Sequence, residues 1–308
     1  MRCSTTGTYS IRRKWLPLIK WKGIAFRLHP LFVLIMIGSV ATGRFAELLA
    51  LFFIVLWHEL GHLLTALRFG WKVKEVKLLP FGGVVEVEDA GSVPVREELW
   101  VAFAGPAQNV VLAAIGMLLA YVGWIDKAWS DDFARANALI ALFNLLPILP
   151  LDGGRMLQSW LSLKLPYHRT LMWSVKISMA FSALMVAASL YPLARGGLLH
   201  LNLLAVGLFL CVSNWTYFRN VPFVFLRFLV HRSERAEQHF DRGKLSMPIV
   251  ISENRPLTRI LKLYMKEQYH LVYVMKQGKI VGVVPEKAII DGFLGRLTSG
   301  HADLKFFM

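Results

Sequence analysis

Long apolar segments separated by short polar stretches run through residues 25–218 of this chain. A transmembrane helix needs about 20 consecutive, mainly apolar residues. The composition agrees, because 56% of the residues are hydrophobic and only 18% are charged, whereas an average soluble domain has about 25% charged residues. We therefore expect an α-helical polytopic membrane protein with six transmembrane helices, at residues 25–43, 45–69, 98–123, 133–163, 170–193 and 198–218.

The basic residues indicate how these helices cross the membrane. The net charge is +15, and Lys and Arg are concentrated in the N-terminal arm, the 70–97 loop and the C-terminal region, which six spans place on one side. Cytoplasmic loops carry an excess of Lys and Arg, so both termini are expected in the cytoplasm. The basic patches fit attraction to anionic membrane lipid, and no nucleic acid is expected as a partner.

Two regions depart from the pattern of apolar spans. VKEVKLL (73–79) and VVEVE (84–88) alternate partly and flank Pro80, Phe81 and two glycines, which predicts a short β-hairpin or re-entrant loop. Further on, an amphipathic helix is predicted by Leu257, Ile260, Leu261, Tyr264 and Met265, followed by strand, turn and strand in LVYVM, KQGK and IVGVV. The expected domains are a basic arm (1–24), a membrane domain (25–218), a basic linker (219–240) and a small cytoplasmic α/β domain (241–308).

The segment LFFIVLWHELGHLLTAL, residues 51–67, places His58, Glu59 and His62 inside an otherwise apolar span. Ionisable groups within a membrane span are costly and indicate a functional site. In a helix, His58 and His62 lie one turn apart on one face and can both reach one zinc ion, and Glu59 can take a proton from water that zinc activates. The alternative is a pair of buried histidines that only hydrogen-bond to neighbouring helices.

A catalytic zinc site needs a third protein ligand and an open position. Asp152, in NLLPILPLDGGR (144–155), is the leading candidate because it is the only acidic residue of its apolar span. The flanking prolines and glycines would break the helix, which is tolerated at membrane depth only inside protein or beside water. At 1.5 Å per residue, Glu59 and Asp152 both lie roughly 15 Å from the cytoplasmic ends of their spans. A capping aspartate at a kinked helix end is the alternative.

HELGH in one span and NLLPILPLDGG in a later one resemble the site-2 protease family of intramembrane zinc metalloproteases, and AGPAQN (104–109) is similar to a recurring element of that family. The resemblance implies that His58, His62 and Asp152 hold one Zn²⁺ and that Glu59 is the general base. It implies that Asn144 helps to hold substrate or transition state, although an interhelical hydrogen bond is an alternative role. The implied activity is hydrolysis of a peptide bond of a membrane-associated protein, within or near the cytoplasmic side of the bilayer.

Residues 256–293 are similar to one cystathionine-β-synthase (CBS) repeat. A site-2 protease core followed by such a region resembles the sporulation branch of the family. That resemblance implies the precursor of a late sporulation sigma factor as substrate, inhibitory membrane protein partners, and the mother-cell membrane around the forespore as location. Paired CBS repeats bind ATP or another adenine nucleotide, so one repeat implies a site completed by a second subunit of a homo-oligomer, or by a divergent repeat. A docking module without ligand is the alternative.

A transmembrane substrate must be unwound before its peptide bonds can be hydrolysed. An edge strand of the 73–88 hairpin could pair with the unwound segment, with Phe81, Val84 and Val85 as candidate contacts, or the hairpin could be purely structural. Two other functions remain open: a prenyl-protein-type membrane metallopeptidase, which normally uses a downstream glutamate as third ligand, and a zinc-binding regulatory protein without catalysis. Asp152 in place of such a glutamate argues against the first, and an intact Glu59 argues against the second.

Overall fold

The computed structural model describes residues 16–21, 24–28, 43, 45–79, 82–87, 93–235, 246–252 and 255–298. The chain divides into two compact units, Met1–Ala90 with Ala104–Ala141 and Gly91–Phe103 with Leu142–Met308. The boundaries fall within two helices, α3 (Val95–Tyr121) and α4 (Lys127–Asn144), so each of these helices contributes residues to both units.

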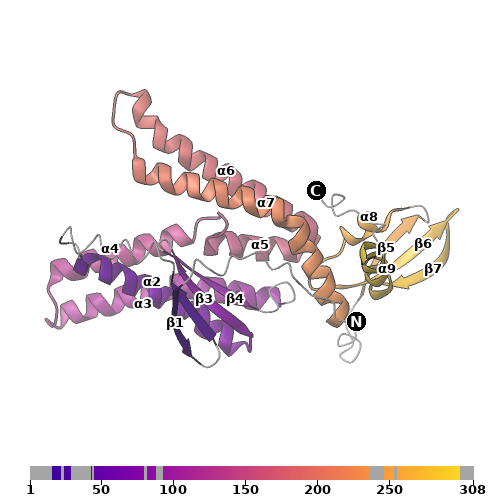
Figure 1. Ribbon diagram of the computed structural model, residues 1–308, viewed down its shortest axis with the longest axis horizontal. Coiled ribbons are helices and arrows are strands. Elements are labelled where there is room, and N and C mark those ends of the chain that lie inside the picture. Colours follow the sequence, from indigo (N-terminus) through magenta and orange to yellow (C-terminus); the bar gives the residue numbers. More distant parts are fainter. Residues whose placement is uncertain are drawn as a thin grey trace, which may run out of the picture. The chain divides into compact units, whose positions relative to one another are not determined.

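The first unit contains a four-stranded sheet in the order β1 (Leu16–Trp21), β2 (Ile24–Leu28), β3 (Val73–Leu79) and β4 (Gly82–Val87). The outer pairs are antiparallel and the central pair β2–β3 is parallel. Helix α2 (Phe45–Arg68) lies between β2 and β3 in the chain. Figure 1 labels α2 together with β1, β3 and β4. The antiparallel β3–β4 pair confirms the predicted hairpin.

The predicted first span, 25–43, is wrong at its start. Ala25 to Leu28 are strand residues that pair in parallel with Glu75 to Leu78 of β3. Periodicity alone does not distinguish a short apolar strand from a helix, and the pairing partner lies far away in the sequence. The rest of that predicted span, 29–42, lies outside the described residues.

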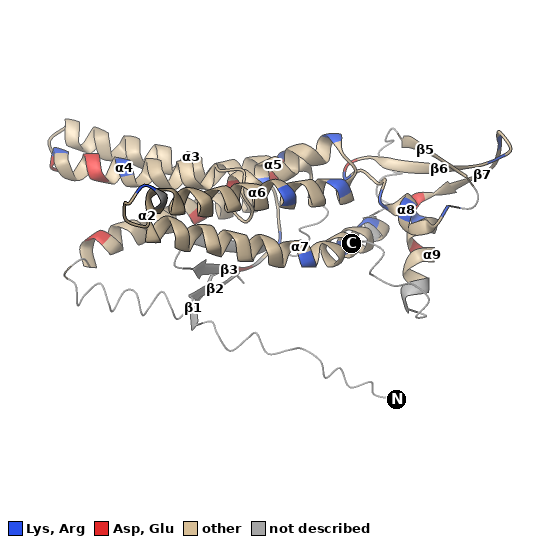
Figure 2. Cartoon of the chain, turned by 90° about the horizontal axis from the view of Figure 1, so that it is seen from above, with Lys and Arg blue, Asp and Glu red and all other residues tan. Residues whose placement is uncertain are grey.

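Among the described residues, four helices are long and apolar enough to cross a membrane: Phe45–Arg68, Val95–Tyr121, Tyr167–Leu193 and Leu201–Ser233. At most 33% of the most apolar window of any of them is buried, which leaves wide apolar faces for lipid. Figure 2 shows that charged residues are sparse along these helices. The structure is therefore that of an integral, polytopic membrane protein, while the expected number of six spans is not confirmed.

The predicted fourth span, 133–163, is interrupted, and the helix break that was expected at its prolines and glycines is confirmed. Helix α4 ends at Asn144 and α5 (Asp152–Lys164) begins eight residues later. Pro147 and Pro150 lie between them, and proline removes a backbone N–H donor and clashes with the preceding helical turn. The prolines therefore explain why one continuous helix cannot form here.

Helix α6 (Tyr167–Ala194) and helix α7 (Leu201–Arg235) follow in the second unit. Residues 219–235, expected in a basic linker, continue α7 instead. The buried residues Val221, Phe225, Phe228 and Leu229 recur along this part of α7 and belong to a hydrophobic core cluster. Such spacing gives a helix a continuous apolar face, which stabilises the segment as a helix despite its basic residues.

The C-terminal module consists of β5 (Ser246–Ser252), α8 (Leu257–Leu261), β6 (Tyr269–Lys276), β7 (Lys279–Pro285) and α9 (Glu286–Thr298). Its sheet has the order β5-β6-β7, with β6 and β7 antiparallel. The predicted strand, turn and strand are confirmed, and Gln277 and Gly278 turn the chain with φ of 50° and 78°. The predicted helix is wrong beyond Leu261, where α8 ends. A CBS fold is not confirmed.

Arg232, near the end of α7, connects α7 to this module, and its contacts determine where α8 ends. Its guanidinium donates to both carboxylate oxygens of Glu286, at 2.9 and 2.8 Å, and to the backbone carbonyls of Met265, Lys266 and Gln268. Burial raises the pKa of Glu286, but a hydrogen bond from His270 and the charge of Arg232 outweigh it and leave that pKa below its ordinary value. Residues 265–268 thus wrap around Arg232 instead of extending the helix.

Candidate metal centre

Helix α2 holds the histidines and the glutamate of HELGH in the interior. His58, Glu59 and His62 are only 3%, 7% and 7% exposed. Residues four apart lie on one face of a helix, and the Nε2 atoms of His58 and His62 are 3.1 Å apart. Zinc–nitrogen bonds of about 2.0–2.1 Å in tetrahedral geometry place two imidazole nitrogens about 3.3 Å apart. The separation in α2 therefore fits two ligands of one zinc ion.

Two glycines let α3 approach α2 closely at this point. A Cβ added to Gly61 would lie 2.6 Å from Cγ of Gln108 and 2.9 Å from the carbonyl oxygen of Ala104. A Cβ added to Gly105 would lie 2.3 Å from Nε2 of His62 and 2.5 Å from Nε2 of His58. Real Cβ atoms essentially never come this close to other atoms, so Gly105 leaves the space that both imidazoles occupy.

Side chains of α3 also hydrogen-bond to α2. The side-chain oxygen of Gln108 accepts a hydrogen bond from the indole N–H of Trp57 at 3.0 Å. Oδ1 of Asn109 lies 2.7 Å from Nδ1 of His58, and both residues are buried. The segment AGPAQN therefore packs directly against HELGH. Sequence reasoning noted this segment only as a family element and assigned it no role.

Asp152 begins α5, at the end of the break after α4. The backbone groups of this break are satisfied by side chains of the following helices: the N–H of Leu149 donates to Oγ of Ser178 at 2.9 Å, and the carbonyl of Leu149 accepts from Asn214 at 2.7 Å. Non-helical backbone at membrane depth needs such partners. Polar residues of α6 and α7 thus hold the segment that leads to Asp152.

The two glycines after Asp152 allow α5 to fold back tightly against this segment. A Cβ at Gly153 would lie 2.1 Å from the carbonyl oxygen of Leu145, and one at Gly154 would lie 2.5 Å from the backbone of Ile148. Both conflicts involve backbone atoms, which cannot move aside easily. The sequence Asp-Gly-Gly therefore fixes where the carboxylate emerges, and Asp152 itself is 7% exposed.

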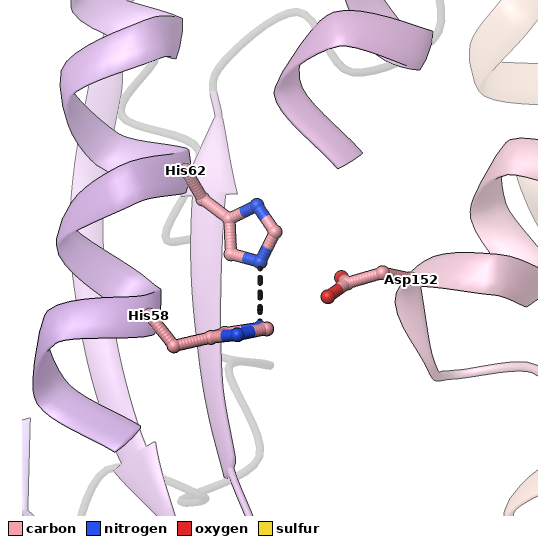
Figure 3. A group of neighbouring side chains, drawn as sticks. All are labelled: His58, His62 and Asp152. Atoms are coloured by element: carbon pink, nitrogen blue, oxygen red, sulfur yellow. Dashed lines mark hydrogen bonds between the residues drawn. The ribbon is translucent and has the colours of Figure 1, made fainter. Parts of the chain in front are cut away.

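Among the described residues, His58, His62 and Asp152 form a group that could hold a metal ion. Each offers one ligand atom, and these atoms all lie within 4.8 Å of one another. Figure 3 shows the two imidazoles of α2 and the carboxylate of Asp152, which points toward them. Two imidazole nitrogens and one carboxylate oxygen are a ligand set of catalytic zinc sites with an open fourth position, so the donors fit zinc.

The remaining predicted site residues lie on separate elements. Glu59 follows His58 in α2, and Asn144 is the half-buried last residue of α4. Val84 and Val85 lie in β4, where only the backbone is described, and Phe81 lies outside the described residues. The roles assigned to these residues stay predictions.

Comparison with known proteins extends these observations. Residues 46–134 and 132–185 match peptidase family M50. The chain is 31% identical over 280 residues to stage IV sporulation protein FB of Bacillus subtilis, which covers 91% of this chain and 93% of that protein. It is 27% identical over 294 residues to a zinc metalloprotease of Methanocaldococcus jannaschii, which covers 90% of this chain and 78% of that protein. A solved structure, the site-2 protease from Methanocaldococcus jannaschii, is similar with a TM-score of 0.53 and 27% identity, covering 66% of this chain and 94% of that one.

The similarity extends far beyond the short motifs, since one relative aligns over 91% of the chain. This similarity argues against a prenyl-protein-type peptidase. One of the relatives is a zinc metalloprotease, which agrees with the possible metal ligands that the structure groups together. The resemblance seen in HELGH and NLLPILPLDGG is thereby confirmed. This chain belongs to peptidase family M50, the site-2 protease family, and is a zinc metalloprotease.

Proposed function

We propose that this protease hydrolyses a peptide bond of a membrane-associated protein, within or near the cytoplasmic side of the bilayer. The observation that carries the proposal is the buried group of His58, His62 and Asp152, whose ligand atoms lie within 4.8 Å of one another. These three residues hold one zinc ion. The histidines lie within a helix long and apolar enough to cross a membrane, so the bond that is cut belongs to a substrate segment that enters the membrane.

Glu59 acts as the general base in this proposal. When bound, zinc supplies a Lewis acid that activates water near neutral pH. Glu59 adjoins a ligand histidine and is buried, so its carboxylate takes a proton from the attacking water and passes it to the leaving amine. Asn144, at the end of α4, binds the substrate or the transition state through its side-chain amide.

Removing the metal ion is expected to abolish cleavage, and adding zinc is expected to restore it. The full-length chain in detergent would be treated with the chelator 1,10-phenanthroline, and cleavage of a single-span substrate would be followed together with zinc per chain. The non-chelating isomer 1,7-phenanthroline is the matched control and should change neither quantity. Full activity in a chain whose zinc content has fallen to background would contradict the proposed function.

Strand β4 receives the unwound substrate in this proposal. In the described part of the sheet, β4 pairs with β3 and lies at the end of the strand order. An edge strand presents backbone groups that can pair with an extended peptide. The substrate would then be held in extended form, which exposes the peptide bonds that a helix hides.

Proline substitutions in β4 test this role. Val84 and Val85 pair with Lys77 and Val76 of β3, and the N–H groups of successive strand residues point to opposite sides of the strand. Val84→Pro and Val85→Pro therefore remove donors on opposite edges, and the variant that loses the donor on the free edge should lose cleavage with zinc still bound. Alanine at the same positions keeps the donors and serves as the control. Normal cleavage by both proline variants would rule out strand pairing.

The similarity to a sporulation protein supports a specific substrate. One relative that aligns over 93% of its length is a stage IV sporulation protein, and we propose that the substrate of this chain is the membrane-associated precursor of a late sporulation sigma factor. The corresponding location is the mother-cell membrane around the forespore, with both termini in the cytoplasm. Inhibitory membrane proteins would then restrain cleavage until the proper time.

The ligand of the C-terminal module stays a prediction. An open hollow of about 630 Å³ lies beside α8, with Arg255 and Arg259 among its lining residues. Binding of ATP or another adenine nucleotide would be tested there by titration of the full-length chain. Assembly into a homo-oligomer through this module is a separate prediction, checked by the mass of the detergent-solubilised protein with and without nucleotide.

A further inference from the structure

A chain of buried polar contacts leads from His58 through α3 into α4. Nδ1 of His58 lies 2.7 Å from Oδ1 of Asn109, and the side-chain N–H of Asn109 donates to the backbone carbonyl of Asn137 at 3.4 Å. Asn137 in turn donates to the carbonyl of Phe133 at 2.9 Å. His58, Asn109 and Asn137 are only 3%, 1% and 0% exposed, so water does not compete for these contacts.

The contacts determine where the proton of the His58 imidazole lies. The carbonyl oxygen of Asn137 can only accept a hydrogen bond, so the NH₂ group of Asn109 must face it. The oxygen Oδ1 of Asn109 therefore faces His58 and accepts a hydrogen bond. The donor must be Nδ1–H of His58, so Nε2 of that ring carries a lone pair instead of a proton. The same Nε2 lies 3.1 Å from Nε2 of His62. Figure 3 draws the contact between these two histidines as a dashed line.

We propose that Asn109 is a positioning residue of the zinc site: it fixes the Nδ1–H tautomer and the ring orientation of His58, so that Nε2 is ready to bind zinc. The proposal rests on the proposed function, in which His58 is a zinc ligand. A hydrogen-bonded partner on the other ring nitrogen sets the tautomer of a ligand histidine and raises its basicity.

The position of Asn109 in α3 supports this role. Gly105 lies four residues earlier, on the same face of the helix, and leaves room for the imidazoles. Gly105 thus provides space for the ring of His58, and Asn109, one turn later on the same face, hydrogen-bonds to that ring. The hydrogen bonds of Asn109 also link three helices, so a test must separate the placement of the ring from simple helix packing.

Gln108 provides the matched control, because it makes the same kind of contact without touching a histidine in any contact described. Its side-chain oxygen accepts a hydrogen bond from Trp57 of α2 at 3.0 Å. Asn109→Leu and Gln108→Met each replace a side-chain amide by an apolar group of similar size, and each removes a hydrogen bond between α3 and α2. Only Asn109→Leu removes the acceptor for His58.

The decisive measurement is the zinc affinity of the full-length chain in detergent, obtained by competition with a chelator. Asn109→Leu is expected to weaken zinc binding by about 10- to 100-fold, and Gln108→Met is expected to leave it within about threefold. In ¹⁵N spectra of labelled histidine, the metal-free wild type should show the Nδ1–H tautomer for His58, and Asn109→Leu should lose it. Asn109→Asp keeps an acceptor for Nδ1–H and should restore most of the affinity.

The other possible results contradict either this proposal or the proposed function. Equal zinc affinity of wild type and Asn109→Leu would overturn the proposal, and so would an equal loss in Gln108→Met or an Nε2–H tautomer of His58 in the wild type. If Asn109→Leu does not fold, Asn109→Asp decides, because a large loss of affinity in that variant would also overturn the proposal. A wild-type chain that binds no zinc would instead contradict the proposed function.

Discussion

Replacing Glu59 by glutamine is expected to lower the rate of peptide cleavage by about 100- to 10,000-fold, the range that general acid–base catalysis contributes. Glutamine has nearly the shape of glutamate but cannot take a proton from water. The residues proposed to hold zinc, His58, His62 and Asp152, remain unchanged, so zinc per chain should stay at the wild-type level. The measurement is cleavage of a co-reconstituted single-span substrate, together with the zinc content of the same samples.

Glu47→Gln is the matched control for this substitution. Glu47 lies in the first turn of the same helix, α2, and its side chain is exposed. The chemical change is identical, but it occurs three turns away from the metal centre, so cleavage should be unchanged. If the Glu59→Gln variant processed the substrate normally with zinc bound, Glu59 would not be the base and the catalytic assignment would fail.

The side chains that the structure groups as possible metal ligands could be predicted because each carries a strong local signal. His58 and His62 have the spacing of one helical turn, and Asp152 is the only acid in its apolar span. The β3–β4 hairpin could be predicted from alternation and turn residues, and Gln277 and Gly278 marked the β6–β7 turn in the same way. In these cases the residues that determine the structure lie close together in the sequence.

Other features could not be predicted because they depend on partners far away in the chain. Strand β2 pairs with β3 about fifty residues later, so the pattern of Ile24–Leu28 alone could not separate it from a helix. The prolines near Leu149 did indicate a break, but Ser178 and Asn214, which satisfy the freed backbone groups, lie 29 and 65 residues further along. Similarly, Arg232 ends α8 through carbonyl contacts 33 to 36 residues away.

Gly105, at the candidate metal centre, is another residue whose role depends on partners far away in the chain. A glycine within an apolar helix can serve close helix packing of any kind, and nothing in AGPAQN indicates which atoms it faces. Only the structure shows that those atoms are the Nε2 atoms of both histidines. The role of Gly105 therefore depends on His58 and His62 of α2, which lie more than forty residues earlier in the sequence.

Gly105→Ala is expected to lower cleavage by about 100-fold or more, since a misplacement of about 1 Å at a catalytic site can cost that much. Its Cβ would lie 2.3 and 2.5 Å from the two Nε2 atoms, so both rings must move. These atoms belong to side chains and not to the backbone, so the rings can shift, at the cost of their present contacts, without moving the backbone. The fold should therefore persist, helped by the higher helix propensity of alanine, about 0.5–1 kcal/mol over glycine. Zinc affinity, cleavage and the melting temperature would be measured together.

Gly116→Ala separates the loss of ligand geometry from a general effect of methyl groups on α3. Gly116 lies on the same helix and is buried, but its added Cβ would meet the ring of Phe133 at 3.1 Å rather than a histidine. That variant should keep zinc affinity and cleavage close to wild type. If Gly105→Ala bound zinc as tightly as wild type, the imidazoles would not need the space that glycine leaves, and the close approach of α3 would serve packing alone. Loss of zinc in Gly105→Ala, with a wild-type melting temperature, would instead establish that α3 shapes the metal centre built on α2.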